Sequence, residues 1–145
     1  MRSALAILAF FLFILSAACS QAGETEGQLA EGETRIAMRD SLFTPNELTV
    51  RRGDEITFRF VNEGKLRHDA FIGDQDAQGI HEDEMRMADD EGHGGHGADE
   101  ADAITVEPGG SGTLRYRFAD RGETLIGCHE PGHYAAGMIV KVTVI

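Results

Sequence analysis

Short segments in which apolar and polar residues alternate run through most of the chain. In residues 56–61, 114–119 and 138–144, every second residue is apolar. Successive side chains of a β-strand point to opposite faces, so this pattern predicts strands with one buried face. Turn sequences rich in Gly, Pro, Asn and Asp separate the segments. Seven or eight short strands joined in this way predict an all-β sandwich.

The first eighteen residues predict a signal peptide. Arg2 provides a positive start, and residues 4–18 form an apolar run that is short for a membrane span. Residues 16–19 resemble a bacterial lipobox, although Ser16 stands where that pattern prefers an aliphatic residue. We expect lipidation of Cys19; the alternatives are cleavage after Ala22, which releases a soluble protein, and a retained anchor. Each of these three outcomes predicts an exported protein of the periplasm or cell envelope. Where an anchor is present, we expect it to be the protein's one contact with the membrane.

Residues 19–34 contain little to bury and predict a flexible tether, so residues 35–145 form the single folded domain. The formal charge of −12 argues against binding to nucleic acid or to an anionic membrane surface. The chain contains no Gly-rich phosphate loop, no Gly-x-Ser-x-Gly motif and no Cys-x-x-Cys pair. Nucleotide-dependent enzymes, serine hydrolases and zinc ribbons are therefore not expected.

Cysteine usage points to a special role for Cys128. If Cys19 is lipidated or removed, Cys128 is the single cysteine of the domain. Exported domains usually pair their cysteines, so an unpaired one needs a reason. It is either an inert buried thiol or a metal ligand.

The spacing around Cys128 favours the metal ligand. The chain reads Cys128-x4-His133-x4-Met138 between two predicted strands, and His68 begins an earlier strand. A thiolate, two imidazoles and a weak axial thioether form the blue-copper ligand set. Two less specific interpretations remain open, in which His68 is an ordinary turn histidine and Met138 is an ordinary core residue. His129 follows Cys128 directly, so its side chain points to the opposite face; we exclude it as a ligand and expect it to be exposed.

These residues resemble the cupredoxins, the type 1 copper proteins that include plastocyanin and azurin. The resemblance covers residues 35–145 and rests on His68, on residues 127–138 and on phrases such as residues 50–54 and 106–109. Within the family, the chain is most similar to exported bacterial copper-tolerance cupredoxins, which also have a His- and Met-containing insert. The resemblance implies an eight-stranded Greek-key sandwich and single-electron transfer through the edge of His133. It also implies one copper held by His68, Cys128, His133 and Met138.

Residues 74–102 form an acidic insert with eleven carboxylates. Its candidate ligands for a second, labile copper site are His81, Met85, Met87, His93 and His96. A helical turn would place His81 and Met85 on one face, with Met87 off that face. The alternative interpretation is a solvated acidic loop that is too polar to contribute to the core.

Two functions fit these observations. The first is an electron carrier that cycles between Cu(I) and Cu(II) and docks a redox partner such as a cytochrome or an oxidase. The second is copper tolerance, by buffering copper or delivering it to copper-handling proteins, which the insert favours. We expect a monomer and no enzymatic activity, because copper enzymes need further copper centres and this chain has one domain.

Overall fold

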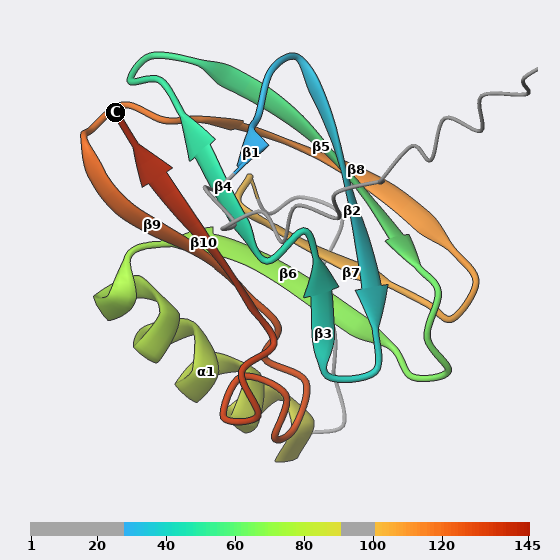
Figure 1. Cartoon of the computed structure of the whole chain (residues 1–145). Coiled ribbons are helices and arrows are strands. Elements are labelled where there is room, and N and C mark those ends of the chain that lie inside the picture. Colours follow the sequence, from blue (N-terminus) through green and yellow to red (C-terminus); the bar gives the residue numbers. More distant parts are fainter. Residues whose placement is uncertain (1–27, 91–100) are drawn as a thin grey trace, which may run out of the picture.

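The computed structural model describes residues 28–90 and 101–145, which fold into two β-sheets packed face to face with one helix beside them (Figure 1). The six-stranded sheet contains, in spatial order, β1 (Gln28–Leu29), β4 (Glu47–Val50), β10 (Ile139–Val144), β9 (Gly122–Gly127), β6 (His68–Gly73) and β7 (Ala103–Val106). The four-stranded sheet contains β3 (Leu42–Thr44), β2 (Glu33–Arg39), β5 (Glu55–Asn62) and β8 (Ser111–Arg117). The predicted β-sandwich is confirmed. Within the described residues, the strands beyond the expected eight are the short β1 and β3.

Strand alternation builds the core between the sheets. Along β5, buried Ile56, Phe58 and Phe60 alternate with residues that are exposed or half-buried. Phe58 packs edge-to-face on Phe118, with ring centroids 6.1 Å apart. Strand β6 differs, because all six of its residues are buried. One face of β6 lies on the core, so its second face must be covered by something other than the opposite sheet.

Helix α1 (Gln75–Asp90) supplies that cover (Figure 1). The side chain of Asp74 caps its first turn by accepting a hydrogen bond from the Ala77 N–H at 2.8 Å. His81 and Met85 are buried on the sheet side, whereas Met87 is 58% exposed, as the predicted helical spacing requires. The alternative interpretation of the insert as a solvated loop is wrong for this part. The insert is polar on average, but one face of its helix is buried against the sheet. Residues 91–100, with His93 and His96, lie outside the described part.

The sheet also extends into the segment expected to be a tether. The Ala30 N–H donates to the Thr49 carbonyl at 2.8 Å, and Ala30 is buried. β1 pairs with β4, and β2 begins at Glu33. Residues 28–34 therefore belong to the sandwich, since a short strand can be held by edge pairing even where its own sequence is polar. No helix in the described residues is long and apolar enough to cross a membrane.

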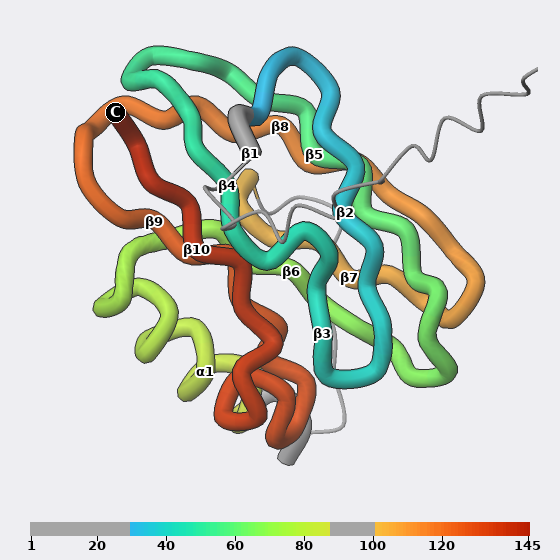
Figure 2. Tube along the Cα trace, viewed as in Figure 1, coloured from blue at the N-terminus to red at the C-terminus, as the bar shows by residue number. Residues whose placement is uncertain are grey.

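One end of the sandwich gathers the segments in which the candidate ligands lie. The loop between β9 and β10 coils beside α1 at this end, near the β2–β3 turn (Figure 2). Buried Asn62 organises the β5–β6 loop, donating from its amide to the carbonyls of Leu66 at 2.8 Å and Val106 at 2.9 Å. Its side-chain oxygen accepts a hydrogen bond from the Gly64 N–H at 2.9 Å. This loop leads directly into His68.

We predict that Asn62→Ala lowers the free energy of unfolding by about 2–4 kcal/mol, because it leaves buried backbone groups without their hydrogen bonds. Denaturant unfolding of the apo protein measures this. Asn46→Ala is the matched control at an exposed position, where the change should stay within about 0.5 kcal/mol. Equal losses in the two variants would contradict the organising role of Asn62.

Candidate metal centre

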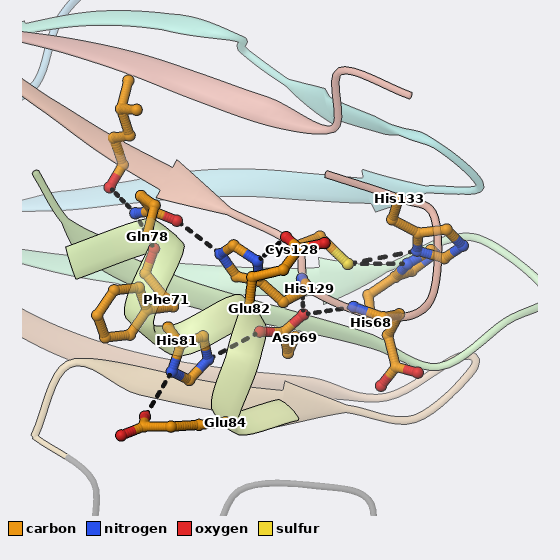
Figure 3. A network of polar contacts seen from close by, with 12 residues as sticks. His68, Asp69, Phe71, Gln78, His81, Glu82, Glu84, Cys128, His129 and His133 are labelled. Atoms are coloured by element: carbon orange, nitrogen blue, oxygen red, sulfur yellow. Dashed lines mark hydrogen bonds and ion pairs between the residues drawn. The ribbon is translucent and has the colours of Figure 1, made fainter. Parts of the chain in front are cut away.

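Three predicted ligands meet at the loop end of the sandwich. The Cys128 sulfur lies 3.3 Å from Nδ1 of His133 and 3.8 Å from Nδ1 of His68 (Figure 3). All three ligand atoms lie within 4.8 Å of one another, and no other such group of His, Cys, Asp or Glu occurs among the described residues. His68 and Cys128 are fully buried, and His133 is half-buried. The structure thus brings together side chains from β6 and from the β9–β10 loop.

The β9–β10 loop is a tight coil whose turns depend on glycine. Gly132 and Gly137 have φ values of 81° and 89°, a region that other residues rarely adopt. Within the coil, the Met138 N–H donates to the His133 carbonyl at 3.0 Å. The Cys128 N–H donates to the Met138 carbonyl at 3.1 Å and closes the loop. Met138 thereby lies opposite Cys128 with its side chain fully buried; its role as an axial ligand stays a prediction.

Two polar contacts join this loop to the start of β6. The buried Asp69 carboxylate accepts hydrogen bonds from the N–H groups of His129 at 2.5 Å and Glu130 at 3.2 Å. Arg67 forms a bidentate ion pair with Glu130, with distances of 2.6 and 3.1 Å. Arg67 and Asp69 flank the ligand His68, whereas His129 and Glu130 follow the ligand Cys128. The two ligand segments are therefore fixed to each other through their neighbours in the sequence.

A third contact lies on the far side of the His68 ring. Asp40 Oδ1 is 3.5 Å from Nε2 of His68 and also accepts hydrogen bonds from the N–H groups of Lys65 and Leu66. The first of these backbone hydrogen bonds is the largest influence that lowers the Asp40 pKa. A carboxylate beside the second nitrogen of a histidine orients the ring and raises its basicity as a ligand. Gly64 leaves room for this contact, because a Cβ there would collide with the Asp40 carboxylate and come within 3.0 Å of Nε2 of His68.

The electrostatics of the cluster suit a soft metal cation. Burial, followed by the charge of His133, lowers the pKa of His68, so its imidazole is neutral and has a lone pair for a metal. Burial raises the pKa of Cys128 far above its usual range, and the Asp69 charge raises it further. A buried thiol in this setting becomes a thiolate only when a cation compensates its charge. Two imidazoles that face one buried sulfur form a donor set that suits copper.

His81 and His129, two further histidines considered in the sequence, lie outside this cluster. His81 lies behind β6, where its ring stacks on Phe71 at 4.0 Å and its Nε2 is 3.6 Å from Asp69. His129 points away from Cys128, as expected, but the expectation that it is exposed is wrong. It is 4% exposed because α1 covers it. Sequence analysis missed the roles of Asp40 and Asp69, although the position of Asp69 directly after His68 could have indicated the latter.

Comparison with known proteins identifies the family and the fold. The model of the plastocyanin/azurin family of copper-binding proteins matches residues 30–145. The chain belongs to this family. It is 34% identical over 116 residues to the copper-resistant cuproprotein CopI of Rubrivivax gelatinosus, a match that covers 79% of this chain and 67% of that protein. It is 30% identical to CopI of Pseudomonas aeruginosa, with 92% of both chains covered.

Solved cupredoxin structures have the same architecture. Reduced auracyanin of Roseiflexus castenholzii superposes with a TM-score of 0.66 at 27% identity, covering 80% of this chain and 98% of that one. An azurin of Methylomonas sp. strain J, at 15% identity, gives a TM-score of 0.62 over 80% of this chain and 99% of its own, a likeness of fold. The protein is therefore a cupredoxin that binds one copper. Bound copper supplies a one-electron couple, and the residues that would hold it are His68, Cys128 and His133.

We predict that Cys128→Ser abolishes the intense visible absorption of the copper-loaded protein. Serine is similar in size, so the fold should persist, but the band arises from charge transfer between a thiolate and copper. Absorption spectroscopy with copper counted in the same sample tests this. A band that survives the substitution would show that the ligand assignment is wrong.

We predict that Gly64→Ala weakens copper binding by about 10- to 100-fold, because the added methyl group displaces Asp40 from His68. Competition with a chelator of known affinity measures the change. Gly79→Ala is the control: a Cβ at this position in α1 meets nothing within 4 Å. Unchanged affinity in Gly64→Ala would mean that the Asp40 carboxylate does not support the ligand.

Proposed function

We propose that this copper-binding protein works in copper tolerance outside the cytoplasm, holding one copper in a type 1 centre that accepts and releases single electrons. The observation that carries this proposal is the buried Cys128 thiol between the Nδ1 atoms of two imidazoles. The relatives named CopI are described as copper-resistant cuproproteins, and one of them aligns along 92% of both chains. Export through residues 1–18 and anchoring through a lipidated Cys19 are part of the proposal.

The exposure of the ligands favours holding copper over catalysis. His68, Cys128 and Met138 are fully buried, so a substrate has no side from which to reach a metal among them. Half-buried His133 alone offers an edge toward solvent. An electron can pass through such an edge, whereas a bound substrate needs an open coordination position. We therefore propose a copper carrier and not an enzyme.

The same edge supports a second candidate function, an electron carrier that docks a redox partner over His133. A rigid ligand frame serves this role as well as it serves copper storage. The partner would be a cytochrome or an oxidase for electron transfer, and a copper-handling protein for tolerance. The two functions predict different effects of removing the copper centre: loss of copper tolerance in the first case and loss of electron transfer in the second.

We expect a copper titration of residues 23–145 to give an intense visible band that saturates at one equivalent. If the insert also binds copper, additional colourless copper will bind and will be lost on deletion of residues 91–100, which contain His93 and His96. Visible absorption read together with total bound copper separates the two populations. The absence of any visible band would contradict a type 1 centre.

Growth on copper tests the cellular role. In a bacterial host made copper-sensitive by deletion of its own export systems, the wild-type chain should restore growth at raised copper, and Cys128→Ser should not. Asp83→Asn, an exposed change on α1, is the control and should restore growth fully. If the wild-type chain gives no protection but accepts electrons rapidly from a reduced cytochrome, the electron-carrier function holds instead.

A further inference from the structure

Helix α1 contacts the copper loop from the side opposite the ligands, and its main contact is His129. The His129 side chain is fully buried, with Nδ1 2.7 Å from Glu82 Oε2 and Nε2 2.7 Å from Gln78 Oε1 (Figure 3). Gln78 and Glu82 are four residues apart, so they lie on one face of α1. The ring of the residue next to Cys128 therefore has a helix acceptor beside each nitrogen, and its N–H donates to one of them.

The orientation of the Gln78 amide is fixed by the sheet. Gln78 is fully buried, and its amide nitrogen lies 3.2 Å from the Phe71 carbonyl, 3.1 Å from that of Leu125 and 3.4 Å from that of Gly73. Three carbonyl acceptors on the nitrogen side leave the side-chain oxygen facing His129. Whichever nitrogen of His129 has the proton, it meets an acceptor. The contact between Gln78 and His129 is therefore made by the side-chain oxygen of Gln78 and not by its amide nitrogen.

The helix also reaches the residue that follows the second ligand histidine. Tyr134 stacks on His129, with ring centroids 4.5 Å apart and planes 20° apart. The Gln75 amide of α1 is 3.4 Å from the Tyr134 hydroxyl. Gly127 allows this packing, because a Cβ there would collide with Gln78 and come within 2.7 Å of the Tyr134 ring. Residues directly after Cys128 and His133 thus pack on each other and on α1.

We propose that α1 positions the copper ligands from behind, with Glu82 and Gln78 as positioning residues that act through His129 and Tyr134. The proposal deepens the type 1 function and rests on it. Cu(II) favours tetragonal geometry, so a thiolate and an imidazole held in fixed positions would oppose that preference in bound copper. If the β9–β10 loop were released from α1, its ligands could move toward the tetragonal arrangement that Cu(II) favours. The helix of the acidic insert therefore sets the spectrum and the potential of a centre that it does not touch.

Substitutions at Glu82 test this, with the neighbouring Asp83 as the control. Both side chains are acidic residues of α1, but Asp83 faces solvent and pairs with Arg86. We expect Glu82→Ala to change the relative intensities of the thiolate–copper bands and to speed copper transfer to a chelator roughly tenfold, the equivalent of one hydrogen bond to a charged group. Glu82→Gln should restore both properties, since its amide oxygen accepts the same hydrogen bond. Asp83→Asn should match the wild type.

His129→Phe provides a second test with no change in acidic charge. The phenyl ring keeps the stacking on Tyr134 but loses both polar contacts, and we expect a lower reduction potential because Cu(II) gains more from relaxation than Cu(I). Wild-type spectra and potentials in copper-loaded Glu82→Ala and His129→Phe would overturn the proposal. A Glu82→Gln that behaves like Glu82→Ala would also overturn it, because charge and not position would then be responsible. A wild-type protein without a visible band would instead mean that the type 1 function itself has failed.

Discussion

The hydrogen bonds from the backbone of the Cys128 loop to the Asp69 carboxylate are the contacts on which the metal centre depends. They join two segments 60 residues apart in the chain, and each segment has a copper ligand next to the bonded residue. The carboxylate is buried, so water does not compete for these N–H groups. Removing it would leave two buried donors without an acceptor, at a cost of about 1–3 kcal/mol each. These hydrogen bonds thus hold His68 and Cys128 close to each other.

Much of this arrangement could be predicted from the sequence, because the relevant signals are local. Period-two alternation gives the strands, and turn residues separate them. The loop from Cys128 to Met138 contains three of the four expected ligands within eleven residues. A donor set of this kind specifies copper by its chemistry, so the family and the cofactor followed before any geometry was known. His68 could be added because a strand start and this loop can meet at one end of a sandwich.

The contacts behind the ligands could not be predicted, because they depend on packing between distant elements. The polar average of the insert concealed a helix whose buried face holds Gln78, His81 and Met85. Nothing in the local sequence of His129 shows that a helix will cover it. The part played by Gly64 is equally invisible in sequence, since it lies in the space that the glycine leaves for Asp40. Such features become visible only when the register of the strands and the position of α1 are known.

The burial of the candidate ligands also affects whether bound copper can react with small oxidants. Loosely held copper is harmful because Cu(I) reacts with peroxide to give radicals, a reaction that needs the oxidant to touch the metal. Here the helix closes the rear of the sheet, and the fully buried His68, Cys128 and Met138 close the interior. Only the edge of His133 reaches toward solvent, and an imidazole conducts electrons without admitting peroxide. A fold of this kind can retain a reactive metal while denying small oxidants access to it.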